Sequence, residues 1–243
     1  MSQKIFLIAA ARPNFMKIAP IWRALERSAS LEPVLIHTGQ HYDKNMSDVF
    51  FADLGLPRPD LHLGVGSGSH AEQTAGVMLQ LEGICLEQRP ALVLVVGDVN
   101  ATMAAAITAK KLNIPVAHVE AGLRSRDWTM PEEVNRILTD SIADLLFTPS
   151  PDADENLRAE GVAEERIVLV GNVMIDSLVN AIETSRDRAK YEDFGLAPRE
   201  YGLVTLHRPA NVDDPGSLRR LCDGLDALAT PLVFPVHPRT RKV

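Results

Sequence analysis

Two acidic side chains stand at the ends of strongly apolar runs in the sequence. Asp98 follows LVLVVG (92–97), and Glu120 closes PVAHVE (115–120). A carboxylate at such a position loses its hydration unless a cation, a polar ligand or a free helix end faces it. Asp98 therefore either caps the next helix or takes part in acid–base chemistry. Glu120 either pairs with Arg124 or takes part in the same chemistry.

A third acid lies near a base in WTMPEEVNR (128–136). Pro131 followed by two acids is typical of an ordinary helix start. Glu132 and Arg136 are four residues apart, however, so one face of that helix could present an acid together with a phosphate-binding base. Both interpretations stay open on the sequence alone.

Cations and polar groups follow the first two predicted strands. Arg12 and Lys17 lie at the start of the helix that follows the first strand, which makes an anion site. Both could equally be surface charges of an amphipathic helix. Gln40 and His41 follow the second strand and face the same expected ligand edge.

Two His-Arg arrangements occur one βα unit apart near the end of the chain. His207 precedes Arg208, and His237 lies two residues before Arg239. Such pairs at successive strand ends indicate a cleft for a phosphorylated ligand, whereas a structurally satisfied histidine is the more common case.

Several familiar cofactor motifs do not fit. The glycines of GVGSGSH (64–70) do not form G-x-G-x-x-G and do not follow the first strand, so Ser69 is interpreted as the cap of the next helix. Phosphate-binding Walker loops, nucleophile elbows and metal-ligand spacings are also lacking. Cys85 and Cys222 are far apart in sequence, which predicts neither a disulfide framework nor a zinc site. We therefore expect no cofactor and no metal.

The elements that must position these residues alternate between short apolar runs and longer amphipathic stretches. This rhythm predicts a parallel α/β sheet with helices on both faces and ligands at the carboxyl ends of its strands. The expected strands are 4–10, 34–38, 92–97, 115–120, 144–150, 166–171, 201–207 and 231–237. The expected helices are 13–28, 42–54, 71–87, 101–112, 132–143, 154–160, 174–188 and 214–229.

The length and composition of the chain limit the classes of protein to which it can belong. The 243 residues, 46% hydrophobic and 23% charged, match a globular protein. They amount to about 1.6 average domains. We expect a Rossmann-like domain over 1–185, a linker over 186–200, and the beginning of an incomplete second Rossmann-like domain over 201–243.

A net charge of −7 argues against nucleic-acid or membrane partners, and the apolar run 5–11 is too short to span a bilayer. The cytoplasm is the expected location.

Several segments in this order resemble one family. They are ARPNFMKIAP, TGQHYDKN, GDVNATMAAA, HVEAGLRSRDWTMPEEVNR, GNVMIDSL, TLHRPANVDD and PVHPRT. Together they are similar to the non-hydrolysing UDP-N-acetylglucosamine 2-epimerases. The resemblance runs from the first strand to the last residue.

The resemblance implies a fold of the glycosyltransferase-B type, a UDP-sugar substrate, a homodimer and a place in cell-surface polysaccharide biosynthesis. It implies epimerisation of UDP-GlcNAc to UDP-ManNAc without NAD or metal. UDP is eliminated to leave a 2-acetamidoglucal and is added back with C2 inverted. By resemblance, the catalytic residues are Asp98, Glu120, Glu132, Arg136 and His207, and the substrate-binding residues are Arg12, Lys17, Gln40, His41, Arg208 and His237.

Departures from the family pattern leave two points open. The first turn reads Ala-Ala-Arg-Pro-Asn, Tyr42-Asp43-Lys44 follows His41, and Pro209 follows Arg208. Activation by substrate at a second site is therefore undecided, and the sugar could be a diacetamido uronic acid. Because most of the family's second domain is missing here, the 243 residues alone are expected to be inactive. The alternatives are a glycosyltransferase of the same architecture and a non-catalytic nucleotide-sugar-binding module.

Overall fold

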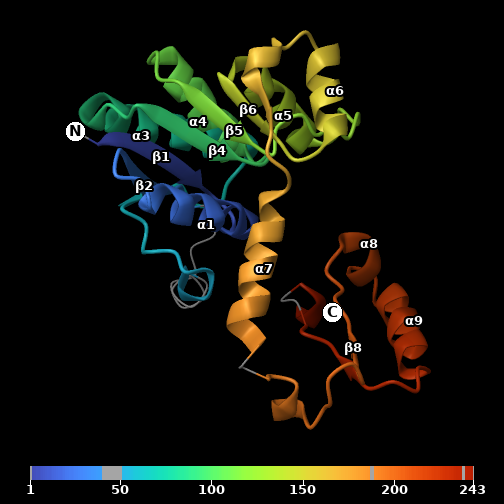
Figure 1. Ribbon diagram of the computed structural model, residues 1–243. Coiled ribbons are helices and arrows are strands. Elements are labelled where there is room, and N and C mark those ends of the chain that lie inside the picture. Colours follow the sequence, from blue (N-terminus) through green and yellow to red (C-terminus); the bar gives the residue numbers. More distant parts are fainter. Residues whose placement is uncertain (1, 40–50, 187–188, 237–238, 243) are drawn as a thin grey trace. The chain divides into compact units, whose positions relative to one another are not determined.

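The structure is a computed structural model that describes residues 2–39, 51–186, 189–236 and 239–242. The chain divides into two compact units, Met1–Glu183 and Thr184–Val243, which Figure 1 colours along the sequence. Each unit is described by itself below. The domain limits expected from the sequence stay a prediction.

The first unit is built on a seven-stranded sheet with the order β3-β2-β1-β4-β5-β6-β7. Every neighbouring pair is parallel, as the alternation of short apolar runs and helices predicts. The strands are β1 (Gln3–Ala9), β2 (Leu31–His37), β3 (Leu61–His62), β4 (Leu92–Val96), β5 (Val116–Val119), β6 (Leu145–Thr148) and β7 (Ile167–Leu169). The short β3 is the one strand of this sheet that the sequence did not predict.

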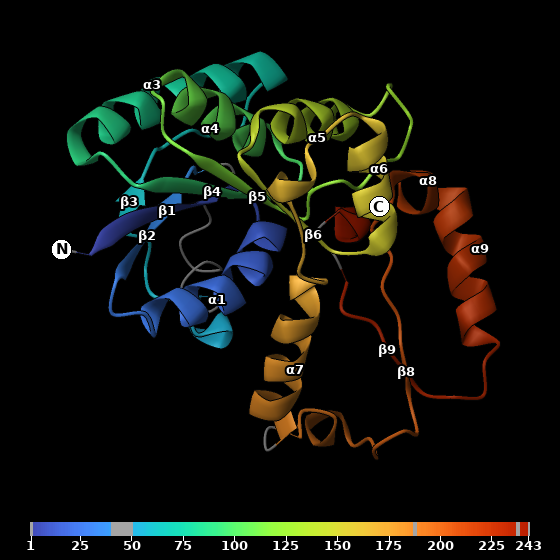
Figure 2. The same ribbon diagram turned by 45° about the horizontal axis from the view of Figure 1, so that its top comes forward.

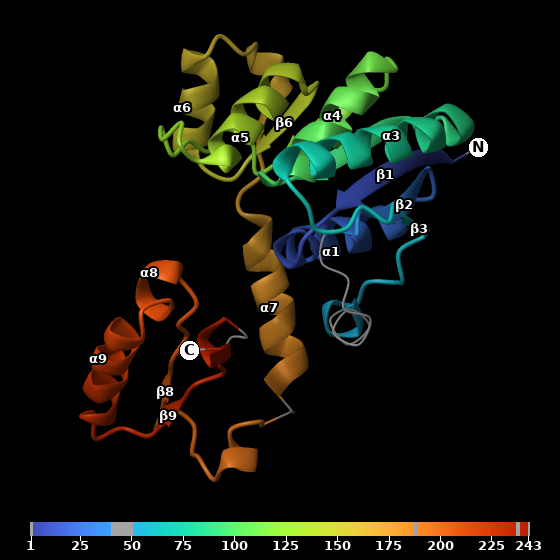
Figure 3. The ribbon, with the colours of Figure 1, turned by 180° about the vertical axis from the view of Figure 1, so that it is seen from behind.

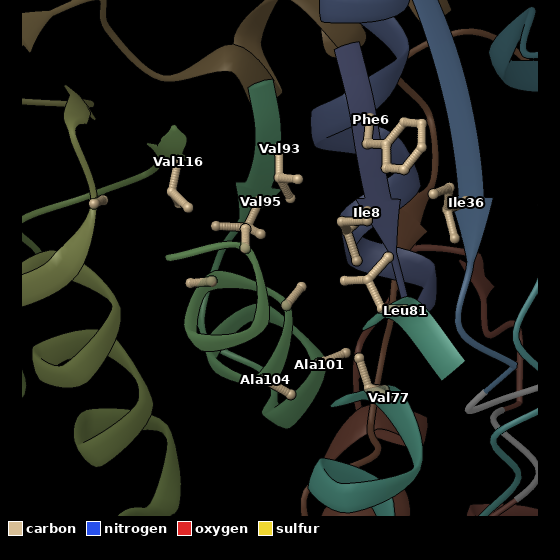
Figure 4. Packing of buried hydrophobic residues seen from close by; sticks show 14 of the residues in the cluster. Phe6, Ile8, Ile36, Val77, Leu81, Val93, Val95, Ala101, Ala104 and Val116 are labelled. Carbon is tan, nitrogen blue, oxygen red and sulfur yellow. The ribbon is translucent and has the colours of Figure 1, made fainter. Parts of the chain in front are cut away.

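Helices cover both faces of this sheet, because the side chains of its central strands alternate between two cores. In β1, Ile5 and Leu7 pack with α1 (Arg12–Glu26), whereas Phe6 and Ile8 belong to the core under α3 (His70–Gln88) and α4 (Asn100–Lys111). Figures 2 and 3 show α3 and α4 on the face opposite α1. Figure 4 shows Ile8 beside Leu81 of α3, and Phe6 and Val77 belong to the same buried cluster. Burial on both faces explains why these strands are apolar throughout.

The remaining helices of the first unit begin close to where the sequence places them. They are α5 (Pro131–Ile142), α6 (Pro151–Ala159) and α7 (Val173–Ser185), whose last two residues lie beyond this unit's limit. The expected cap is confirmed: the Ser69 hydroxyl accepts a hydrogen bond from the Glu72 backbone at 3.2 Å. Of the expected helix 42–54, residues 51–54 are helical and 42–50 lie outside the described residues.

The second unit contains much shorter strands than expected. β8 (Gly202–Leu203) and β9 (Leu232–Val233) form a parallel pair, accompanied by α8 (Pro209–Val212) and α9 (Pro215–Asp226). The seven-residue strands 201–207 and 231–237 were thus overestimated, although position 237 itself lies outside the described residues. In the described part, each of the two strands has one hydrogen-bonded neighbour, and a pair of strands is marginal without further partners.

No helix in the described segments is long and apolar enough to cross a membrane.

Candidate active site

The predicted ligand edge lies where the order of the strands reverses. The chain adds β2 and β3 on one side of β1 and then returns to place β4 on the other side. Such a switch point is the usual ligand crevice of an open parallel sheet. Asn14, in the first turn of α1, fixes this corner. Its side chain donates to the Val96 carbonyl of β4 at 3.2 Å and accepts from the Ala11 N–H at 2.9 Å.

Lys17 and Glu120 form an ion pair at this switch point. The Lys17 ammonium contacts Glu120 Oε2, and the side chains are only 11% and 22% exposed. Glu120 has a left-handed φ of 73°, a conformation that non-glycine residues adopt mainly where the surroundings impose it. The interpretation of Lys17 as a surface charge is wrong. The alternative pairing of Glu120 with Arg124 is also wrong, because Arg124 binds Asp140 and Glu160 instead.

Asp98, the residue after Gly97, forms a second ion pair with Arg136. Its Oδ2 accepts from Arg136 Nη2 at 2.5 Å, and the Asn135 amide donates to the Asp98 carbonyl at 2.8 Å. Val99 is the N-cap of α4, and no side chain caps that helix. The capping interpretation of Asp98 is therefore wrong, and its carboxylate instead faces a cation of α5.

Glu133 is the acid on α5 that sequence reasoning missed. Arg136 donates to its carboxylate at 2.9 Å, and the backbone N–H groups of Ser125 and Arg126 donate at 2.9 and 2.8 Å. Burial raises the pKa of Glu133, but these hydrogen bonds outweigh it and lower the pKa to about 2. The expected neighbour of Arg136, Glu132, is half-buried on the same helix. A carboxylate three residues before the arginine, rather than four, thus holds the guanidinium.

Gly97 lies against the Lys17–Glu120 pair and directly precedes Asp98 of the other pair. Its φ is +67°, and a Cβ built on it would lie 2.8 Å from Lys17 Nζ and 3.4 Å from Glu120 Oε2. Only a residue without a side chain leaves this space to the two charged groups. Three carboxylates and two cations therefore lie around the ends of β4 and β5, which is an arrangement suited to proton transfer beside an anionic group.

The other predicted site residues are exposed or lie outside the described residues. Arg12 is exposed at the start of α1 in the first unit. His207 and Arg208 are exposed in the second unit, where His207 Nδ1 lies 3.4 Å from Thr205 Oγ1. Gln40, His41 and His237 are outside the described residues.

A groove of about 480 Å³ adjoins the cluster on the side of α3, α4 and α5. Its walls are mainly apolar, with Met78, Met103 and Leu138 among them, and its polar residues include Asn100 and Asn135. Asn135 contacts both Asn100 and the Asp98 carbonyl, at 3.3 and 2.8 Å. The groove thus borders the Asp98 turn without containing the charged groups.

Comparison with known proteins decides the family. The family model described as UDP-N-acetylglucosamine 2-epimerase matches residues 23–243. The chain belongs to this family of isomerases. A Methanococcus maripaludis protein named UDP-N-acetylglucosamine 2-epimerase homolog is 45% identical over 98% of the chain and 67% of its own length. A Pseudomonas aeruginosa UDP-2,3-diacetamido-2,3-dideoxy-D-glucuronate 2-epimerase is 42% identical over 99% of the chain and 68% of its own length.

Solved structures of this epimerase family share the fold. The Methanocaldococcus jannaschii UDP-GlcNAc 2-epimerase, crystallised with UDP-GlcNAc and UDP, has a TM-score of 0.85 and 41% identity. The match covers 98% of this chain and 67% of that one. The α/β fold expected from the sequence is confirmed, with a first Rossmann-like domain and part of a second. The chain spans about two thirds of the length of these epimerase relatives.

Proposed function

We propose that this chain carries the acid–base half of a cofactor-independent epimerase that inverts C2 of a UDP-N-acetylhexosamine. One observation supports the proposal above all. Lys17–Glu120 and Asp98–Arg136 form two ion pairs around Gly97 at the switch point of the sheet. The names of the relatives, epimerases of UDP-sugars, support the interpretation of this arrangement as a site for such a reaction.

The reaction needs a base and an acid at C2 and cations for the departing diphosphate. A carboxylate removes the C2 proton while the C1–O bond breaks, so UDP leaves and a 2-acetamidoglucal remains. UDP then adds back to C1 as a proton returns to the opposite face of C2, and the product is an isomer of the substrate. Asp98, Glu120 and Glu132 are the candidate acids and bases for these two proton transfers.

The cations have a distinct part in this proposal. Lys17 is the opposite charge that contacts the Glu120 carboxylate in this largely buried position. Burial lowers the pKa of Arg136, but Glu133 and Asp98 outweigh this effect and raise it above its ordinary value. Arg136 is therefore a permanent cation, and with His207 it is proposed to stabilise the diphosphate charge. Arg12, Gln40, His41, Arg208 and His237 are proposed to bind the rest of the substrate.

Two relatives leave two substrates to compare. The M. jannaschii protein is named for UDP-GlcNAc, and the P. aeruginosa protein for a diacetamido uronic acid, at almost equal identity to this chain. We propose UDP-N-acetylglucosamine as the substrate and a homodimer as the working form. The diacetamido glucuronate is the second sugar to test.

Exchange of the C2 proton with solvent tests the reaction directly. UDP-GlcNAc is incubated in deuterium oxide without any acceptor, and deuterium at C2 is followed by NMR together with formation of the C2 epimer. Incorporation is expected for an epimerase, whereas a glycosyltransferase or a binding module incorporates none. The absence of exchange with both sugars would overturn the proposed function.

The assay needs two forms of the protein. The 243-residue chain alone is predicted not to turn over substrate. A chimera that appends the remaining third of the M. jannaschii epimerase is predicted to exchange C2. In this chimera, D98N and E120Q should each lower the exchange rate by about 100-fold or more, a typical loss for a positioned acid or base. K111Q, which removes a charge at the far end of α4, is the control and should leave the rate unchanged.

A further inference from the structure

His118 has hydrogen-bond acceptors at both of its ring nitrogens. The side chain, on β5, is fully buried. Its Nδ1 lies 2.6 Å from Asp140 Oδ1, and its Nε2 lies 2.8 Å from the carbonyl oxygen of Gly97. A neutral imidazole has one N–H donor, so it can satisfy only one such acceptor, while the imidazolium can satisfy both.

Asp140 is in the ionised form that an imidazolium requires. Its second oxygen accepts from Arg124 Nη1 at 2.7 Å and from the Gly122 N–H at 3.0 Å. Burial raises the pKa of Asp140, but the charges and hydrogen bonds of His118 and Arg124 outweigh it and hold the pKa below its ordinary value. Arg124 also pairs with Glu160. From Asp140 to Arg124 to Glu160, the charges therefore alternate in sign.

The His118 side of the pair holds the turn that carries Asp98. Gly97 donates its N–H to the Val119 carbonyl at 3.1 Å and accepts from His118 through its own carbonyl. Both backbone groups of Gly97 are therefore bound to β5. Because Asp98 follows directly, its backbone is fixed relative to the strand that leads to Glu120.

The Asp140 side of the pair holds the turn that carries Glu120. Asp140 contacts Gly122 and Arg124, which lie two and four residues after Glu120. We propose that His118 and Asp140 are positioning residues, an imidazolium–carboxylate pair whose hydrogen bonds set the turn bearing Asp98 against the turn bearing Glu120. The functional meaning of this pair rests on the proposed function, because that function assigns the two acids to the reaction.

The charge state of His118 can be measured on the 243-residue chain itself. In a sample with ¹⁵N-labelled histidine, the ring signals of His118 are assigned by their loss in H118Q. At neutral pH, both ring nitrogens are expected to carry a bonded proton, because each faces a hydrogen-bond acceptor. One ring nitrogen without a proton would overturn the proposal.

Two conservative variants separate the two sides of the pair. The amide nitrogen of a Gln side chain lies near the place of Nε2 and can still donate to Gly97, whereas that of Asn lies near Nδ1 and can still reach Asp140. In backbone amide spectra, H118N should shift the signals of Gly97 and Asp98 more than H118Q does. The signals of Gly122 and Arg124 should show the reverse order, and equal patterns in the two variants would contradict a positioning role.

The proposal stays testable where one variant fails to fold. The ring measurement is made on the unsubstituted protein, and its signals can be assigned with whichever of H118Q and H118N folds. In the chimera, H118N should lower kcat for C2 exchange by about 10- to 100-fold with KM within about 2-fold, and H118Q should retain more of kcat. A change confined to KM would contradict the role. The ring and amide measurements involve no turnover, so their failure is distinct from failure of the proposed epimerisation.

Discussion

Residues predicted to be catalytic follow β4 and β5 in the first unit and β8 in the second, but their surroundings differ. Asp98 and Glu120 follow central strands of a seven-stranded sheet, and their ion-pair partners are largely buried. His207 follows a strand of two residues in the second unit, and its side chain is exposed. The described part of the second unit has one other strand, β9.

This contrast shows what positions a charged side chain. At the ends of β4 and β5, apolar packing on both faces fixes the backbone, and buried hydrogen bonds then fix the side chains. In the second unit, by contrast, the side chains of the Asp213–Arg239 ion pair are both about half exposed. Such pairs lose little when they separate, because water replaces the partner. Charge alone therefore does not make a site; burial around the charge does.

Removing an aspartate from each unit should give the largest difference. D140A leaves His118 and Arg124 without their buried partner, and we expect the free energy of unfolding to fall by about 3–5 kcal/mol. Urea denaturation followed by the fluorescence of Trp22, which is buried in the first unit, measures this loss. D213A is the matched variant in the second unit, and hydrogen exchange of the α9 amides should remain unchanged. If D213A lowered the protection of the α9 amides as strongly as D140A lowers the stability of the first unit, the comparison would be contradicted.

A smaller effect is expected from E133Q, which keeps the shape of the side chain but not its charge. We expect a loss of about 2 kcal/mol at neutral pH, because Arg136 loses a charged acceptor. The pKa of Glu133 is about 2 in the folded state and 4.5 ordinarily. Its contribution is therefore complete above about pH 5 and disappears as the pH falls through the folded value. Urea midpoints of the two proteins should converge in acid, and a constant difference down to pH 2 would refute this.

G97A tests the turn between the two ion pairs. Alanine is strained at a φ of +67°, and its Cβ would displace the Lys17 ammonium. We expect a loss of about 1–2 kcal/mol in the unfolding of the first unit. G224A in α9 is the counterpart, because its Cβ would meet nothing within 4 Å and its φ is not positive. That substitution should increase the protection of the α9 amides, and a loss of protection there would count against the contrast.

The smallest effect is expected from salt, which should change the pKa of the exposed Asp213 carboxyl but not that of the buried Asp140 carboxyl. Hydrogen bonds from Arg239 hold the pKa of the exposed Asp213 carboxyl below its ordinary value. In about 1 M salt this pKa should rise toward the ordinary value, because screening acts on exposed pairs. The pKa of Asp140 should stay low, since its partners are buried with it. Carboxyl ¹³C signals followed through an acid titration measure both, and parallel shifts would show that burial makes no difference.

The order of the elements and the places of the two acids were predictable from the sequence. Uninterrupted apolar runs such as LVLVV identify strands covered on both faces, and the polar residues directly after them must lie at the ligand edge. Local chemistry was equally readable, as the Ser69 cap and Pro131 at the start of α5 show. These features depend on residues a few positions apart, so a single stretch of sequence contains the whole cause.

The partners of those acids were decided only by the tertiary structure. Lys17 meets Glu120 across 103 positions because the sheet order places β1 beside β4 and β4 beside β5. Arg136 binds Glu133 and Asp98 because α5 packs with that side toward the end of β4. His118 was hidden for the same reason: one polar residue within an apolar strand gives no sign of Asp140 or Gly97. Sequence thus determined which residues reach the ligand edge, whereas the crossover of the chain determined which charges meet there, because ion pairing depends on distance in space.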